Sequence, residues 1–242
     1  MYTMNDIHMH IIPGVDDGAW NHEMAHDMIH IAYCQGIDKI IATPHSMDIQ
    51  DETEEMNAEF TILKGWLEKD GLPVKLYQGC EVYCSYYTME EVIQNLNVGK
   101  IPTMNGTKYV LAEFSTGAMP GMIEYCLGKL IENQYIPIIA HVERCFELFK
   151  SENLGKLQEF KNMGCLMQVN VYSVFEEEKE HIKKAARYLM EHKMADFLGS
   201  DAHRTFHRPP CVEKGLEYLY QNYEKEYVDR IAVKNAEELL FR

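Results

Sequence analysis

Short apolar runs rich in β-branched residues recur along the chain, and longer amphipathic stretches separate them. Runs of this length and composition predict buried strands. The predicted strands are residues 6–12, 37–43, 74–82, 109–114, 136–141, 166–171 and 197–200. The spacing of apolar positions predicts helices at 22–34, 53–69, 122–133, 154–163 and 178–192, and two more within 211–242. Strand and helix therefore alternate throughout.

This alternation, with strands too apolar to have a wet face, predicts a parallel sheet covered by helices, either doubly wound or closed into a barrel. The polar residues favour the barrel, because six of the seven strands deliver one at or just after the C-terminal end, which is where barrel sites form. These residues are His8, His10, His45, Glu81, Glu113, His141, Asp201 and His203. The strand around Val169 supplies no obvious ligand, although Asn170 stands near its end.

Composition narrows the class of protein. The 242 residues are 46% hydrophobic and 25% charged, which fits one globular α/β domain spanning residues 1–242. No apolar run is long enough for membrane insertion and no signal peptide is visible, so we expect a cytoplasmic protein. The net charge of −15 disfavours nucleic acid as a partner. Seven scattered cysteines without a Cys-x-x-Cys indicate reduced thiols.

Two paired motifs suggest a metal site. His8 and His10 lie two residues apart on a predicted strand, as do Asp201 and His203 beyond another, so each pair can converge on one point. The turn-rich loop 13–18 adds Asp16 and Asp17, of which one can bend back over the strand end. Imidazole mixed with carboxylate suits Mn²⁺, Fe²⁺ or Zn²⁺. Nine candidate ligands are too many for one ion, and clustered cations usually serve hydrolysis, most naturally of a phosphate ester.

The order of these motifs resembles the polymerase and histidinol phosphatase (PHP) superfamily. Within it, the sequence is most similar to the bacterial manganese-dependent protein-tyrosine phosphatases of the CpsB type, from capsule and exopolysaccharide clusters. The motifs that carry the resemblance are DIHMHIIPGVDDG at 6–18, TPH at 43–45, GCEVY at 79–83, AEF at 112–114, AHVER at 140–144, GSDAH at 199–203 and RPP at 208–210. The resemblance implies a distorted seven-stranded (β/α) barrel with helices outside and the metal site at the C-terminal rim.

The resemblance also implies three divalent ions, Mn²⁺ in the first place, with Fe²⁺ or Zn²⁺ as alternatives. One ion would be held by His8, His10, Glu81 and Asp201, a second by Glu81, Glu113 and His141, and a third by Asp17, His45 and His203. Arg144 and Arg208 would grip the phosphate, since a guanidinium can bind two phosphate oxygens at once. The expected catalytic residues are therefore Arg144, Arg208, Asp201 and His203, with His203 able to assist the leaving phenolate. The implied partner is a phosphotyrosine protein, in particular a cognate bacterial tyrosine kinase.

Other functions stay open at this point. A histidinol-phosphate phosphatase would share the metals and differ in its substrate pocket, and a metal-binding scaffold without catalysis would share the ligands. A binuclear amidohydrolase ranks lower, because the strand 109–114 offers Glu113 where that class uses lysine. A thiol phosphatase is excluded by the sequence, since no cysteine is followed six positions later by arginine.

Several other residues could contribute to the site or imitate it. Arg204 follows the Asp-x-His pair where related sequences often have Asn, and we expect a surface charge more than a third phosphate contact. His207 is a candidate for the mouth of the pocket. His22, His26 and His30 repeat every four residues along one predicted helix, where we expect them to face solvent or a neighbouring helix instead of a metal.

Overall fold

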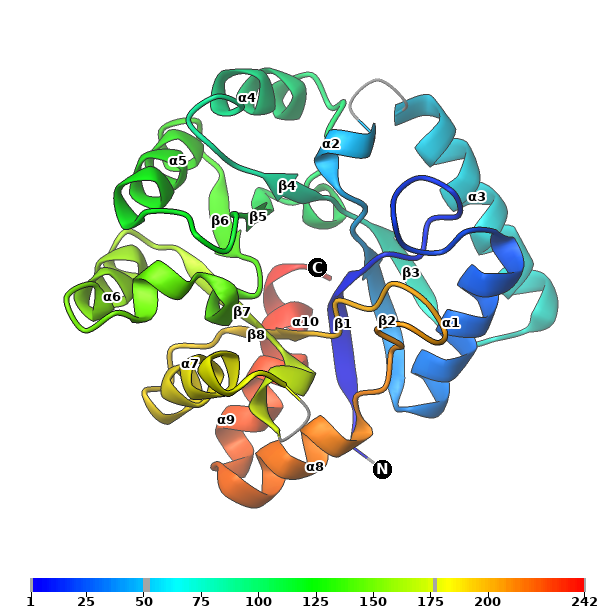
Figure 1. Cartoon of the computed structure of the whole chain (residues 1–242). Helices are drawn as coiled ribbons and strands as arrows, with labels where there is room; N and C mark the ends of the chain where they lie inside the picture. Colours follow the sequence, from blue (N-terminus) through cyan, green and yellow to red (C-terminus); the bar gives the residue numbers. More distant parts are fainter. Residues whose placement is uncertain (1, 50–52, 176–177, 242) are drawn as a thin grey trace.

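The strands of the computed structural model run parallel around a common centre, with the helices outside them (Figure 1). The structure describes residues 2–49, 53–175 and 178–241. The strands are β1 (Met4–Met9), β2 (Ile37–Ala42), β3 (Lys75–Gln78), β4 (Glu81–Tyr83), β5 (Tyr109–Glu113), β6 (Ile136–Ile139), β7 (Leu166–Asn170) and β8 (Phe197–Gly199). They form one sheet in the order β1-β2-β3 and a second in the order β4-β5-β6-β7-β8, with every pair parallel. The predicted α/β barrel is confirmed.

The predicted third strand, 74–82, is divided in the structure, which is the main departure from the sequence prediction. β3 ends at Gln78 and β4 begins at Glu81 in the other sheet. Between them Gly79 passes so close to Ile41 that a β-carbon there would lie 2.7 Å from the Ile41 side chain. The chain bends at this glycine and moves from one sheet to the other, and this bend distorts the barrel.

The barrel closes where β1 meets the end of β8. The backbone amide of Asp201 donates to the His8 carbonyl (2.8 Å), and the amide of His10 donates to the Ala202 carbonyl (2.9 Å). One carboxylate oxygen of the buried Asp6 accepts from the amides of both His8 and Ser200. The seam between the two ends of the chain therefore runs through candidate metal ligands.

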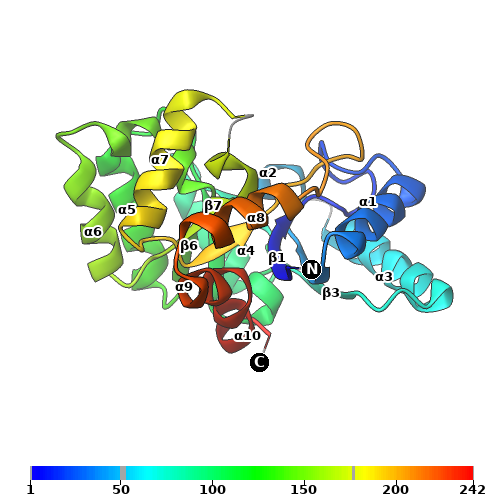
Figure 2. The ribbon, with the colours of Figure 1, turned by 90° about the horizontal axis from the view of Figure 1, so that it is seen from below.

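The helices lie around the strands as an outer ring, except α10, which lies behind the strands near the middle of Figure 1 (Figures 1 and 2). They are α1 (His22–Cys34), α2 (Ser46–Ile49), α3 (Thr53–Asp70), α4 (Met89–Asn97), α5 (Pro120–Glu132), α6 (Leu154–Asn162), α7 (Glu180–Glu191), α8 (Glu213–Asn222), α9 (Lys225–Asp229) and α10 (Asn235–Leu239). A π-helical turn, Arg230–Lys234, joins α9 to α10, so the two helices predicted in 211–242 are confirmed. The amphipathic helix α4 was not among the predicted helices.

Two hydrophobic cores hold these layers together. The larger one fills the space between the strands and the outer helices. The smaller one lies inside the barrel, where Ile7, Leu111, Ile138 and Phe197 meet Leu240 near the C-terminus. In side view α10 lies on the edge of the molecule away from the loops that follow β1 and β8 (Figure 2). The C-terminal segment therefore plugs the N-terminal end of the barrel and leaves the other end free for a site.

Two histidines of α1 face the neighbouring helix and the third, His30, is exposed, as expected. His22 pairs with Glu59 and His26 with Asp70, each at 2.9 Å, and both partners lie on α3. They join two outer helices and lie outside the groups of possible metal ligands found among the described residues. Across those same residues, no helix has the length and apolar character needed to cross a membrane.

Candidate metal centre

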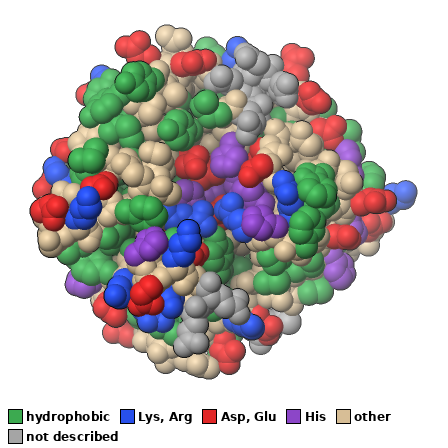
Figure 3. All heavy atoms as spheres, in the orientation of Figure 1, with side chains coloured by type: hydrophobic (Ala, Val, Ile, Leu, Met, Phe, Trp, Pro, Cys, Tyr) green, Lys and Arg blue, Asp and Glu red, His purple; other side chains and the backbone are tan. Residues whose placement is uncertain are grey.

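All nine predicted ligands come together at the C-terminal rim of the barrel. Histidine, arginine and acidic side chains gather at the middle of this face (Figure 3). The described residues contain four groups whose ligand atoms lie within 4.8 Å of one another. These groups are His10, Asp17, His45 and His203; His8, His10 and Asp201; His8, Glu81 and His141; and His45, Glu81 and Glu113. They include every residue predicted as a ligand.

The groups only partly follow the three sets that the resemblance implies. Asp17, His45 and His203 fall together as expected, and so do His8, His10 and Asp201. Glu113 and His141, expected around one ion, fall in separate groups that share Glu81. Glu81 belongs to two of the four groups, as do His8, His10 and His45, so the groups share residues and form one continuous cluster.

Hydrogen bonds from the far side of the ring fix the orientation of three histidines. Nδ1 of His10 donates to Asp16 (2.7 Å), and Nδ1 of His203 donates to the Asp201 carbonyl (3.0 Å). Nδ1 of His8 lies 3.1 Å from Gln168 Oε1, an atom that also accepts from the His141 amide, so this Nδ1 is the donor. Each ring therefore turns Nε2 toward the centre, the arrangement typical of metal-ligating histidines.

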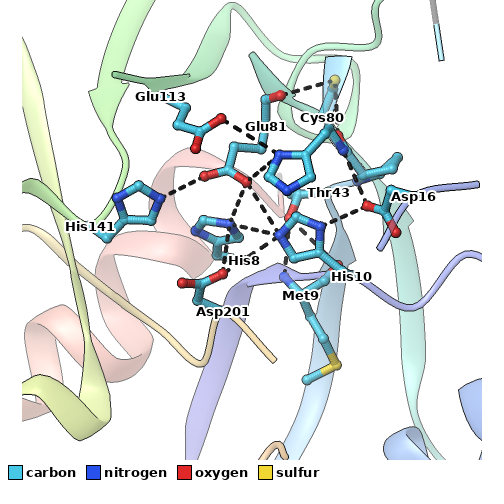
Figure 4. Close-up of polar contacts among 12 residues, drawn as sticks. His8, Met9, His10, Asp16, Thr43, Cys80, Glu81, Glu113, His141 and Asp201 are labelled. Carbon is cyan, nitrogen blue, oxygen red and sulfur yellow. Dashed lines mark hydrogen bonds and ion pairs between the residues drawn. The ribbon is translucent and has the colours of Figure 1, made fainter. Parts of the chain in front are cut away.

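The buried centre carries polar atoms that need a positive charge between them. Nε2 of His8 lies 3.2 Å from Nε2 of His10, and Glu81 Oε2 lies 3.2 and 3.3 Å from these two atoms (Figure 4). Glu81 is only 1% exposed, and its Oε2 has no hydrogen-bond partner. The lone pairs of the two Nε2 atoms and of this carboxylate oxygen point toward one another. They repel one another unless a cation or a proton lies among them. The residues present therefore fit bound metal ions.

The pKa values of two histidines show the same demand for positive charge. Burial lowers the pKa of His10, but the carboxylates of Asp16 and Glu81 outweigh it and raise that pKa to about 10. Burial also lowers the pKa of His45, and Glu113 and Glu81 raise it to about 11. The carboxylates thus hold cationic charge at the rim, where protons and metal ions compete for the same nitrogens.

The two neighbouring aspartates of loop 13–18 divide two tasks. Asp17 Oδ1 lies 3.2 Å from Nε2 of His203 and 3.5 Å from Nε2 of His45, as a ligand requires. The Asp16 side chain is fully buried, and it accepts from His10 Nδ1 and from the amides of Gly18 and His45. Asp16 therefore orients ligands, and Asp17 is the aspartate that joins a ligand group.

Both predicted phosphate-binding arginines converge on Asp201. Arg144 Nη1 donates to Asp201 Oδ2 (2.9 Å), and Arg208 Nη2 pairs with the same oxygen. The other edge of Arg144 donates to the Tyr172 hydroxyl. The side chains of Arg144 and Arg208 remain 22% and 28% exposed. They are held beside the centre with room to contact a ligand at the rim.

Strand β7, for which the sequence offered no ligand, supplies supporting contacts. Gln168 Nε2 donates to Asn170 Oδ1 (2.8 Å), and Asn170 Nδ2 donates to Asp201 Oδ2 (2.9 Å). With its bond to His8, Gln168 thus begins a chain of side chains that ends at Asp201. The sequence marks Asn170 by its position near a strand end, whereas no motif marks Gln168 or Tyr172.

Three site residues have backbones in the left-handed region that side chains rarely adopt. The φ angles are 29° for His141, 53° for Asp201 and 54° for Arg208. Such strain costs about 1–3 kcal/mol per residue and persists where the surroundings impose it, most often at functional sites. The three residues with this backbone strain are also held by the hydrogen bonds and ion pairs of the site.

Cys80, next to Glu81, is a structural residue. It is 1% exposed, and its thiol donates to the Pro44 carbonyl (3.2 Å). Burial and the neighbouring Glu81 raise its pKa well above the usual value for cysteine. A neutral thiol is a poor nucleophile, so the structure agrees with the exclusion of a thiol phosphatase.

Fold and centre together define an α/β-barrel protein with a metal-binding centre at its C-terminal rim. The sequence matches the capsular polysaccharide synthesis family CpsB/CapC over residues 4–241, and the chain belongs to this family. A tyrosine-protein phosphatase CpsB of Streptococcus agalactiae serotype III (strain NEM316) is 31% identical over 244 residues, covering 98% of each chain. The family predicted from the motifs is therefore confirmed.

Solved structures agree with this assignment. A structure from a study of YwqE of Bacillus subtilis and CpsB of Streptococcus pneumoniae, described as unique metal-dependent tyrosine phosphatases, has a TM-score of 0.82 and 30% identity. The match covers 98% of this chain and 94% of the other. An amidohydrolase from Mycoplasma synoviae has a TM-score of 0.62 at 14% identity, covering 98% of this chain and 87% of the other, and shows the fold alone. The chain is thus a member of a family of metal-dependent tyrosine-protein phosphatases.

Proposed function

We propose that this chain removes phosphate from phosphotyrosine in a protein substrate, using three divalent ions with Mn²⁺ in the first place. The observation that carries the proposal is the convergence of nine ligand candidates and two arginines on one rim, in a chain of the CpsB/CapC family. Bound divalent ions supply a water that is deprotonated near neutral pH and offset negative charge on phosphate oxygens.

The ligands of the three ions are proposed as the motifs predict. Glu81 connects one set, His8, His10 and Asp201, with another, Glu113 and His141, and the third set is Asp17, His45 and His203. The ring orientations support this use of His8, His10 and His203, because each presents Nε2 to the centre.

Arg144 and Arg208 are proposed to bind the phosphate. Asp201 pairs with both guanidinium groups, and Tyr172 pairs with that of Arg144. The two arginine side chains therefore lose little conformational freedom when their remaining N–H donors bind a phosphate dianion. As charge builds on the nonbridging oxygens, both guanidinium groups stabilise it. The leaving phenol has a pKa of about 10, so a strong general acid is not required. His203 acts better as a ligand than as an acid, because its Nδ1–H is engaged and Nε2 faces the centre.

A cognate bacterial tyrosine kinase is proposed as the physiological substrate. The association of the family with capsular polysaccharide synthesis supports this choice. The protein substrate to test first is therefore a kinase that is phosphorylated on tyrosine and whose gene lies beside the gene for this protein.

Metal removal and restoration test the proposal. Purified protein is stripped with a chelator and assayed on a phosphotyrosine peptide, on the phosphorylated kinase and on histidinol phosphate. We expect no turnover without metal, recovery with Mn²⁺, and preference for the two phosphotyrosine substrates.

Glu81→Gln should lower kcat/KM by roughly 10³-fold or more, since it removes a charge on which the ligand groups depend. The matched control is Glu159→Gln, at an exposed carboxylate of α6. Full activity in metal-free protein would contradict the proposal. A preference for histidinol phosphate would instead indicate a histidinol-phosphate phosphatase.

A further inference from the structure

Two large aromatic side chains lie in contact at the rim, although they come from opposite ends of the chain. The rings of Trp20 and Phe206 have centroids 5.6 Å apart at an interplanar angle of 62°. Both remain largely exposed, Trp20 at 55% and Phe206 at 65%. Single exposed apolar residues are common on protein surfaces, but a contacting pair of large rings offers a continuous apolar surface. We call this pair the aromatic platform.

Arg204 fixes the platform in place. Its guanidinium lies over Trp20, with Cζ 4.5 Å from the ring centroid. Nη2 donates to the Asp17 carbonyl (2.9 Å) and Nε to the Gly18 carbonyl (3.4 Å). With Nε and Nη2 engaged and one face of the guanidinium against the indole, Arg204 holds loop 13–18 and Trp20 together.

The platform is continuous with the catalytic centre. Trp20 follows Asp17 by three positions and Phe206 follows His203 by three, and Asp17 and His203 belong to the same ligand group. On the rim seen in Figure 3, hydrophobic side chains border the central histidines and arginines. The two rings therefore lie beside the centre, within reach of a residue next to the phosphotyrosine of a peptide bound there.

We propose that the aromatic platform binds an apolar or aromatic side chain flanking the phosphotyrosine in the protein substrate. This inference rests on the proposed phosphatase activity and adds a sequence preference to it. Trp and Phe offer rigid contact area at a small entropic cost, which is why aromatic residues dominate binding surfaces. An apolar neighbour covers the exposed faces of Trp20 and Phe206, whereas a serine or glycine neighbour leaves them in water.

Paired peptides test the preference. Two phosphotyrosine peptides carry either Leu or Ser on both sides of the phosphotyrosine and are otherwise identical. Wild-type protein with Mn²⁺ should show a kcat/KM for the Leu peptide roughly five- to tenfold above that for the Ser peptide, the size expected for one aromatic packing contact. Phe206→Ser should reduce this ratio to below about twofold. Val98→Ser is the matched control, because Val98 is 70% exposed at the end of α4, away from the rim, and should keep the wild-type ratio.

Fluorescence gives an independent readout of contact. The chain has two tryptophans, so Trp66→Phe leaves Trp20 as the only indole. A nonhydrolysable phosphonate version of the Leu peptide should shift Trp20 emission at saturation, and the Ser version should not.

Equal kcat/KM for the two peptides in wild type, or an unchanged ratio in Phe206→Ser, would overturn the platform. Hydrolysis of free phosphotyrosine, measured in the same samples, separates this result from failure of the phosphatase itself. If free phosphotyrosine is not hydrolysed by the metal-loaded wild type, the proposed function fails and the platform falls with it.

Discussion

Gln168 positions ligand candidates of the centre without being one itself. Its Oε1 accepts from His8 Nδ1 and from the His141 backbone amide, so one side chain positions two ligand candidates. Gly199 allows this approach, since a β-carbon there would lie 2.8 Å from Gln168 Nε2. Gln168 is fully buried, and water cannot replace its bonds.

Replacing Gln168 should weaken metal binding more than catalysis. In Gln168→Leu, His8 loses the acceptor that fixes its tautomer, and changes of this kind typically cost 10- to 100-fold in metal affinity. We therefore expect the Mn²⁺ concentration for half-maximal activity to rise by roughly that factor, with kcat recovering mostly at saturating Mn²⁺. Titration of metal-stripped protein measures this. Gln158→Leu, on the exposed face of α6, is the control, and equal titration curves for the two variants would refute the role.

The sequence reveals ligands more readily than the residues that support them. His8, Glu81 and Asp201 stand in short motifs at strand ends, and strand ends meet at one rim once a parallel barrel is assumed. Gln168 bonds to a residue 160 positions away, and no local pattern marks such a partner. The choice between Asp16 and Asp17 likewise depends on loop geometry, because adjacent carboxylates look alike in sequence.

At the scale of elements, the C-terminal helix closes the end of the barrel away from the site. Asn5, near the start of β1, donates to the Val233 carbonyl (3.2 Å), and Asn235 donates to the Asp196 carbonyl just before β8 (2.8 Å). The Leu240 carbonyl accepts from Asn105 (2.7 Å), and its side chain is fully buried in the core inside the barrel. The segment thus acts as the floor of the barrel.

Shortening a buried side chain of this floor should destabilise the protein and leave catalysis intact. Leu240→Ala removes buried methyl groups and should cost about 2–5 kcal/mol in the free energy of unfolding. Urea denaturation measures the loss, and kcat at saturating Mn²⁺ should stay within about twofold because the rim lies at the other end. Leu239→Ala, at a partly buried position, should cost clearly less. A large drop in kcat at full folding would contradict this separation of floor and site.

Most elements were predictable because their apolar periodicity is strong, as for α1, whose predicted bounds match His22–Cys34. The division of the third strand was not, because residues 74–82 read as one apolar run, and the bend depends on how Gly79 packs against Ile41. The helix predicted at 178–192 is α7, which begins at Glu180 and ends at Glu191. Periodicity reports which residues are buried, but tertiary contacts decide where a strand bends.

At the scale of the whole molecule, the candidate centre and the barrel depend on the same strands. Ligand candidates lie in or shortly after β1, β2, β4, β5, β6 and β8, and the seam between β1 and β8 is bonded through His8, His10 and Asp201 themselves. Bound cations therefore connect strands that are far apart in the sequence. They also offset the mutual repulsion of the buried carboxylates, which are part of the excess of acidic residues behind the net charge of −15. Metal binding and folding should be thermodynamically linked.

This linkage predicts a metal-dependent melting temperature that does not require any substrate. A ligand at 100 times its Kd stabilises the native state by about 2.7 kcal/mol, and each kcal/mol shifts Tm by about 2–4 °C in proteins near this size. Mn²⁺ added to stripped protein should therefore raise Tm by roughly 5–11 °C per tightly bound ion, as measured by scanning calorimetry. Glu81→Gln should lose most of the increase, because three of the four ligand groups contain Glu81 or its close neighbour His8, whereas Glu159→Gln should keep it. A Tm that does not respond to Mn²⁺ would show that the rim does not bind the ion in the folded protein, whatever the activity assays report.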